Sequence, residues 1–297
     1  MSWSARWRPT GDPSVERESL LATLIVLLGG AALQLFAVWP GRIDTHSAAR
    51  QRERVLWLAL WWPAAPALTV AAWLCGWALS QPDPVPKHVG GVIFVAVLPF
   101  VLVGTRALLR ATWSLCRSPR DHGIATIGLL WPRIVVAPEL TRILDERALE
   151  AALAHERAHL RHRDPLRIWL AQFVTDLQWP RSSAQRRFTD WLVSLEEARD
   201  DEARAGGVEG ADLAAAVLGS VRFQLGFRMA SANLIGEAEG LPGRIARLLR
   251  PLPASAPYQE PPYFIVGGGV ATVWLAAVVL GLTSGERFID ALLALSS

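Results

Sequence analysis

The side chains best suited to chemistry in this sequence lie in the run AHERAH, where His155, Glu156 and His159 form an H-E-x-x-H pattern. Residues four apart project from the same face of a helix, so both imidazoles can reach one Zn2+. Glu156 is then close enough to take a proton from a metal-activated water that attacks a peptide carbonyl. His162 follows one turn later, but we expect it outside the ligand set, because a fourth protein ligand would close the position needed for water.

A catalytic zinc site needs a third protein ligand, and the acidic run SLEEARDDEA supplies the candidates. Glu196 and Asp200 are four residues apart and share one helical face, as do Glu197 and Asp201 one position later. We predict that Glu196 binds the metal, because it lies on the less polar side of the helix, and that Asp200 hydrogen-bonds a ligand histidine. Glu197 remains the alternative ligand.

Three helices are expected to position these side chains. The H-E-x-x-H pattern lies in a predicted helix over 143–163, for which Asp145 is the expected N-cap. The next helix is predicted over 163–179, with Asp164 as its N-cap and Pro165 as its first helical residue, a position that proline tolerates. The third helix carries the acidic run and is expected to end at a pair of glycines.

Two short strands and two amphipathic segments complete the region around the motif. The β-branched runs at 124–130 and 133–138 are bounded by glycine and proline, which predicts a hairpin or an edge pair. The segments 211–227 and 241–252 have amphipathic patterns, and are expected either to pack on the domain or to lie on a membrane surface. The region is therefore predicted to be mainly helical, with a small β element.

Long apolar windows are the second prominent feature of the sequence. Hydrophobic residues make up 52% of the chain and the mean hydropathy is +0.26, which is high for a soluble protein. Four windows have about the length that crosses a bilayer, roughly 20 residues. They lie at 20–40, 55–80, 91–109 and 263–282. We therefore predict a mainly α integral membrane protein with about four transmembrane helices and a cytosolic, zincin-like helical protease domain.

The expected domains follow from these windows: residues 1–110 hold three membrane helices, 111–262 the protease domain, and 263–297 the fourth helix with a short tail. Arginines gather in the loop between the first two windows and at both ends of the protease domain, whereas the loop before the third window has only Lys87. The positive-inside rule then places the protease domain in the cytosol and both termini outside. The same arginines explain the pI of 9.4, so no nucleic-acid partner is expected.

The run LEAALAHERAHLRHRDPLR, followed later in the chain by EEARDDEA, resembles the BlaR/MecR-type membrane metallopeptidases, an antibiotic-sensor family. The pattern is also similar, more distantly, to the HtpX and CAAX-prenyl-protease family. The resemblance implies one Zn2+ per chain, bound by His155, His159 and Glu196. It also implies that Glu156 is the general base and that Asp200 hydrogen-bonds a ligand histidine without binding the metal itself.

The resemblance further implies a multi-pass protein of the bacterial inner (cytoplasmic) membrane, with its catalytic domain in the cytosol. Its expected partners are the lipid bilayer and a protein or peptide substrate, for which a transcriptional repressor is one candidate. The resemblance does not extend to β-lactam sensing, because only the run TSGERFIDALLALSS follows the fourth window. An HtpX-like quality-control protease and a non-catalytic membrane signal transducer are the alternative functions.

Overall fold

The computed structural model describes residues 48–65, 68–69, 72–73, 89–115, 123–179, 181–228, 241–251, 275–277, 279–280 and 283. The chain divides into two compact units. One unit comprises residues 1–39, 62–103 and 259–297, and the other comprises residues 40–61 and 104–258. All of the candidate chemistry lies in the second unit, which we call the site unit.

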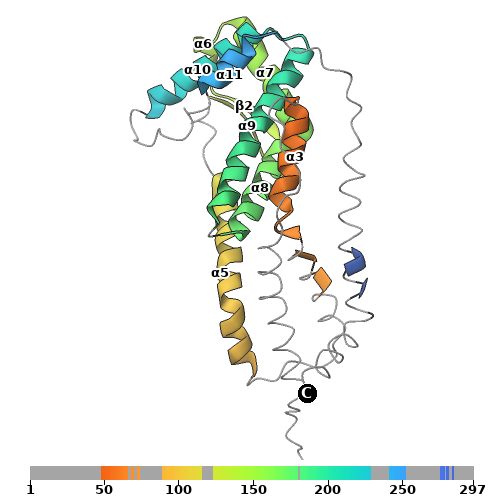
Figure 1. Cartoon of the computed structure of the whole chain (residues 1–297). Helices are drawn as coiled ribbons and strands as arrows, with labels where there is room; N and C mark the ends of the chain where they lie inside the picture. Colours follow the sequence, from red (N-terminus) through yellow and green to blue (C-terminus); the bar gives the residue numbers. More distant parts are fainter. Residues whose placement is uncertain are drawn as a thin grey trace, which may run out of the picture. The chain divides into compact units, whose positions relative to one another are not determined.

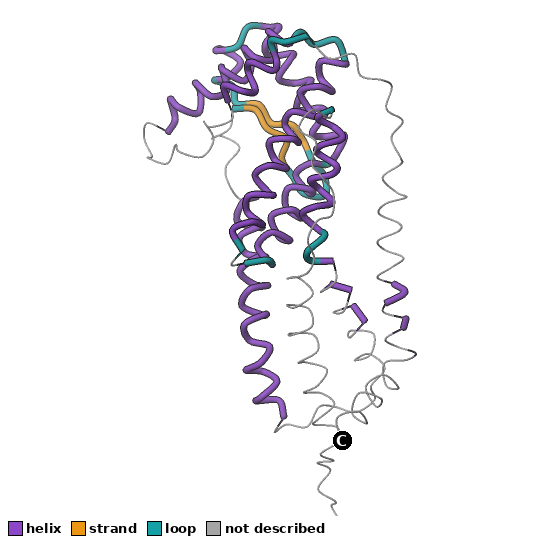
Figure 2. Tube along the Cα trace, viewed as in Figure 1, coloured by secondary structure: helices purple, strands orange, loops and turns teal. Residues whose placement is uncertain are grey.

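The described part of the chain is mainly helical, with one small antiparallel sheet, as predicted (Figures 1 and 2). The elements in chain order are α3 (Ala49–Trp61), α5 (Val89–Leu115), β1 (Ile124–Ile127), β2 (Arg133–Val136), α6 (Leu140–Ile143), α7 (Glu146–His162), α8 (Asp164–Leu177), α9 (Ser182–Ala205), α10 (Gly210–Arg228) and α11 (Leu241–Leu248). The predicted helices around the motif are confirmed, with ends that differ by a few residues.

Among the residues that the structure describes, none of the helices has both the length and the apolar character needed to cross a bilayer. The membrane spans predicted from the sequence therefore have no support from the described helices. The predicted window at 20–40, and most of the window at 263–282, lie outside the described residues.

The predicted hairpin is confirmed. Strands β1 and β2 pair antiparallel, from Ile124 opposite Val136 to Ile127 opposite Arg133. The turn between them requires a glycine, because Gly128 has φ +102° and a Cβ atom there would lie 2.6 Å from the carbonyl oxygen of Trp131. The hairpin packs against α7, and so lies beside the helix that carries the H-E-x-x-H pattern.

Helix α7 is the central helix of the site unit, and its small residues allow close packing on more than one side. Ala148 and Ala152 face a buried cluster that includes residues of the hairpin, α6 and α10. Ala151 faces a second cluster, with Leu213 of α10 and Leu248 of α11. Helix α9 also packs on α7. The histidines of α7 are therefore held on a helix that neighbouring elements fix in place.

The ends of α7 are set by two different devices. Asp145 is the N-cap, as predicted, and its side chain accepts a hydrogen bond of 2.8 Å from the backbone N–H of Ala148. At the other end, Arg163 adopts the left-handed conformation, with φ 52°, and serves both as the C-cap of α7 and as the N-cap of α8. The prediction that Asp164 caps α8 is wrong: Asp164 is the first residue of that helix, and its buried side chain is engaged by other groups.

Replacing Asp145 by alanine is expected to lower the free energy of unfolding by about 1 kcal/mol, because one N–H at the start of α7 loses its partner. Urea denaturation followed by circular dichroism would measure the change. Asp145→Asn is the matched control, since asparagine caps helices about as well as aspartate. An equal loss of stability in both variants would contradict the capping role.

Helix α3 packs against α9 and α8, and lies along them in Figure 1. The apolar windows predict a loop at residues 49–54 between two membrane helices, whereas the structure has a helix from Ala49 onward. Leu56 and Leu60 of α3 are buried, and Trp57 lies 5.1 Å from the ring of Trp191 on α9. Helix α3 is thus part of the fold that holds the candidate site, which sequence reasoning did not anticipate.

Candidate metal centre

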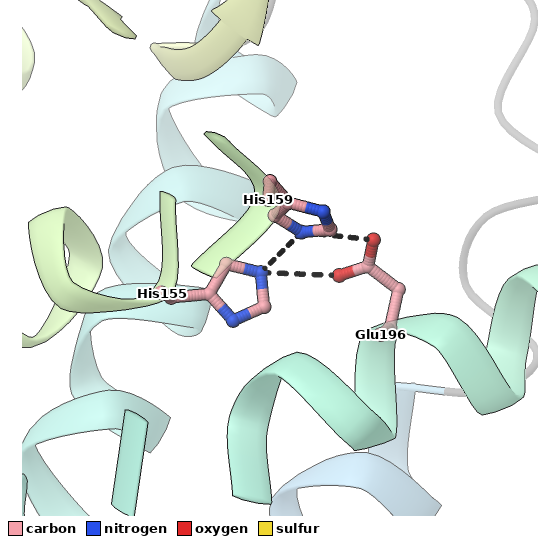
Figure 3. A group of neighbouring side chains, drawn as sticks. All are labelled: His155, His159 and Glu196. Carbon is pink, nitrogen blue, oxygen red and sulfur yellow. Dashed lines mark hydrogen bonds and ion pairs between the residues drawn. The ribbon is translucent and has the colours of Figure 1, made fainter. Parts of the chain in front are cut away.

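Three side chains of the types that can bind a metal ion converge between α7 and α9 (Figure 3). The Nε2 atoms of His155 and His159 lie 2.9 Å apart. The carboxylate of Glu196 reaches both, with Oε2 3.3 Å from Nε2 of His155 and Oε1 3.5 Å from Nε2 of His159. Both histidines are buried, while the side chain of Glu196 is 36% exposed, so the group opens to solvent on the Glu196 side. The three predicted ligands are therefore brought together.

The other nitrogen of each histidine faces its own carboxylate. Nδ1 of His155 lies 2.9 Å from Oδ1 of Asp200, and Nδ1 of His159 lies 2.8 Å from Oδ2 of Asp164. A carboxylate at Nδ1 favours the proton on that nitrogen, which leaves the lone pair on Nε2. When both imidazoles are neutral, their Nε2 lone pairs and the Glu196 carboxylate point at one another without a donor among them. Such a group of acceptors suits a cation.

Asp164 is a functional contact that sequence reasoning missed. It was assigned to the cap of α8, yet it lies behind His159 in the same way that Asp200 lies behind His155. Both carboxylates are fully buried. The available signal was the spacing, since Asp164 follows His159 by five residues, at the point where α7 gives way to α8.

Two arginines hold these buried carboxylates in place. Arg199 of α9 donates to Asp164 through Nε at 2.5 Å and Nη2 at 2.9 Å. Arg244 of α11 donates to Asp200 through Nε and Nη2, both at 2.8 Å, and its Nη1 lies 3.0 Å from Oε2 of Glu196. Forked pairs of this kind fix orientation as well as charge. Arg244 was not singled out from the sequence, because its helix lies more than 40 residues from the acids that it holds.

The charges around the histidines create a negative potential. Burial would lower the pKa of His155, but Asp200 and Glu196 outweigh it and raise that pKa to about 10. Burial would raise the pKa of Glu196, yet Arg244 and the two histidines hold it well below its usual value. A potential that favours a proton on His155 also favours a divalent cation, which competes with protons for the same nitrogen.

The donor set fits Zn2+. Two neutral imidazoles and one carboxylate form one of the ligand sets of catalytic zinc sites, in which a fourth position is left for water or substrate. Carboxylates that hydrogen-bond the far nitrogens of ligand histidines are a regular part of such sites. Asp164 and Asp200 occupy those places here.

Glu156 follows His155 on α7, and its side chain is bound by the hairpin. The hydroxyl of Thr126 on β1 donates to Oε2 of Glu156 at 2.7 Å, and also lies 3.0 Å from the backbone oxygen of Glu156. The structure thus fixes one oxygen of the predicted general base by a strand residue. Thr126 carried no signal in the sequence beyond its place in a short β-branched run.

Replacing Thr126 by valine is expected to reduce kcat by about threefold to tenfold, because one hydrogen bond of about 1 kcal/mol that orients Glu156 is lost. Zinc content and KM should stay at wild-type values, since the hydrogen bonds of the Thr126 hydroxyl go to Glu156 and not to a metal-ligand candidate. Steady-state kinetics on a fluorogenic peptide, together with metal analysis, would measure these quantities. Thr126→Ser keeps the hydroxyl and should behave like the wild type.

The remaining acidic and histidine candidates have other partners. Glu197 pairs with Arg52 of α3, so it does not point at the histidines. Asp201 is bound by Arg247 at 2.7 Å. Nε2 of His162 lies 2.8 Å from Oε2 of Glu202, outside the converging group.

The comparisons with known proteins bear on the same part of the chain. The family described as BlaR1 peptidase M56 matches residues 122–181. These residues are similar to the M56 peptidases, and we call them the M56 segment. This segment runs from the hairpin to the end of α8, so it contains His155, Glu156 and His159 but not Glu196. Comparisons with curated proteins and with solved structures found no match.

The M56 segment covers about a fifth of the chain and confirms the predicted BlaR/MecR-type resemblance. It indicates a peptidase of the metallopeptidase type. The more distant resemblance to the HtpX and CAAX-prenyl-protease family is not supported by the match. Glu196 and Asp200, whose carboxylates contact His155, lie on α9, after the matched residues. The packing of α9 on α7 brings them to the histidines.

Proposed function

We propose that the protein is a zinc-dependent endopeptidase that binds one Zn2+ per chain through His155, His159 and Glu196. The observation that carries the proposal is the convergence of two Nε2 atoms and a carboxylate, while both Nδ1 atoms are occupied by the separate carboxylates of Asp164 and Asp200. The M56 segment supports peptide bonds as the class of substrate.

The bound zinc would supply Lewis-acid chemistry, polarising a peptide carbonyl and lowering the pKa of water. Glu156 then acts as the general base and takes a proton from the attacking water. It returns that proton to the nitrogen of the leaving amine. Thr126 keeps the carboxylate of Glu156 oriented for both transfers. A protein that only transmits a signal would not need Glu156, so the presence of this residue, oriented by Thr126, favours catalysis over a purely non-catalytic role.

The substrate that we propose is a cytosolic or membrane-associated protein. The proposed location is the inner membrane of a bacterium, with several spans and the site unit in the cytosol. The apolar windows and the distribution of arginines in the sequence support this location. The resemblance to BlaR/MecR-type peptidases makes a transcriptional repressor the first substrate to test, in a signalling role.

The test combines metal analysis with a cleavage assay on the purified full chain. We expect about one zinc per chain and cleavage of an unstructured protein such as casein, or of a quenched fluorogenic peptide library. A zinc chelator should abolish cleavage, and added zinc should restore it. Purified protein that binds no zinc at micromolar concentration, or cleavage that is unaffected by the chelator, would overturn the proposal.

A further inference from the structure

Helix α3 contributes one buried acid to the site unit. Glu53 is fully buried, and Nε1 of Trp191 donates to its Oε1 at 3.1 Å. Arg167 of α8 donates to the same oxygen through Nη2. The other oxygen of Glu53 is buried without a hydrogen-bond partner among the described residues. A carboxylate held in this way is not explained by stability alone, because buried ion pairs are often no more stabilising than apolar residues of similar size.

The contacts of Glu53 continue without a break to a predicted zinc ligand. Arg167 binds Glu53 with Nη2, and its Nη1 donates to Oδ1 of Asp164 at 3.1 Å. Asp164 in turn faces Nδ1 of His159 at 2.8 Å. The guanidinium of Arg167 is also fixed by its neighbours, 5.0 Å from the ring centroid of Trp57. Arg167 and Asp164 therefore form a continuous series of polar contacts from Glu53 to His159.

Three groups contact the carboxylate of Asp164, and Glu53 binds one of them, Arg167. Arg199 and Arg167 both bind Asp164, and His159 presents its Nδ1 to the same carboxylate. Glu53 and Asp164 together offset the two arginine charges. Without the charge of Glu53, Arg167 would face Asp164 alone, and its guanidinium would be drawn further onto the oxygens that orient His159.

We propose that Glu53 of α3 is a positioning residue of the metal centre, which sets the orientation of His159 through Arg167 and Asp164. This inference rests on the proposed function, since it concerns the same zinc site. Among the described residues, the hydrogen bonds of Glu53 go to Arg167 and Trp191, so its effect on the proposed zinc ligands would pass through the intervening residues. Groups that orient a ligand histidine commonly change metal affinity by about 10- to 100-fold.

The test measures the zinc dissociation constant of the full chain by chelator competition, the visible spectrum of the cobalt-substituted protein, and kcat with KM. For Glu53→Gln we expect zinc binding weaker by about tenfold, an altered cobalt spectrum and a lower kcat at unchanged KM. Glu53→Asp keeps the charge and should recover part of the affinity. If Glu53→Gln does not fold, Arg167→Lys carries the same expectation, because a lysine cannot bridge two carboxylates with a planar fork.

Leu56→Ala is the matched control, because Leu56 is a buried neighbour on the same helix that makes no charged contact. It should lower the stability of the fold and leave zinc affinity and the cobalt spectrum unchanged. The inference is overturned if Glu53→Gln binds zinc like the wild type, or if Leu56→Ala weakens zinc binding equally. A wild-type chain that binds no zinc would instead overturn the proposed function, so the two failures are distinct.

Discussion

Replacing Glu156 by glutamine is expected to slow peptide cleavage by about 100- to 10,000-fold, the range that a general base contributes. Glutamine keeps the shape of the side chain and can still meet the hydroxyl of Thr126, but it cannot accept the proton of the attacking water. Zinc content should remain at about one per chain, because Glu156 is not one of the converging ligands. Single-turnover cleavage and metal analysis on the same preparation would measure both quantities.

Glu150→Gln is a suitable control for this variant. Glu150 lies on the same helix with an exposed side chain, so the same chemical change is made away from the site. The control should cleave at the wild-type rate. A Glu156→Gln protein that retains full activity would exclude Glu156 as the base, and one that loses zinc would place it among the ligands instead.

Replacing Glu196 by alanine is expected to weaken zinc binding by at least about 100-fold, more than the loss of a group that only orients a ligand. The reason is direct: the carboxylate that reaches both Nε2 atoms is removed. Cleavage should be lost along with the metal. Chelator competition on the purified full chain would measure the affinity.

The neighbouring Glu197→Ala tests the register of the acidic helix. Glu197 pairs with Arg52 of α3 and points away from the histidines, so its removal should leave zinc affinity at the wild-type value. Equal losses in both variants would contradict the assignment. Loss of zinc only in Glu197→Ala would favour the alternative register that the sequence left open.

The parts of the fold that were predictable are those set by local spacing. The pattern from His155 to His159 requires only helical periodicity, and the cap at Asp145 requires only the four residues that follow. The hairpin of β1 and β2 is equally local, because its two β-branched runs are bounded by glycine and proline. These features need no information about the rest of the chain, so a single sequence was enough.

The features that the sequence did not reveal depend on residues far apart in the chain. From its position in the sequence, Asp164 could cap a helix or contact His159. In the structure it contacts His159, and Arg199 of α9 donates a hydrogen bond to the same carboxylate. Arg244 and Thr126 approach the site from α11 and β1, at separations of 44 and 30 residues from their partners. Such contacts leave no periodic pattern, so only the assembled fold shows them.

The place of α3 has a practical consequence for anyone dividing this protein into fragments. A polypeptide of residues 111–262, the predicted protease domain, would lack α3, whose Trp57 packs on Trp191 of α9. The apolar surface of α9 that α3 contacts would then meet water, and the fragment would be prone to aggregate. A synthetic peptide of residues 48–62, added in trans, should restore the solubility of the fragment by covering that surface of α9 again.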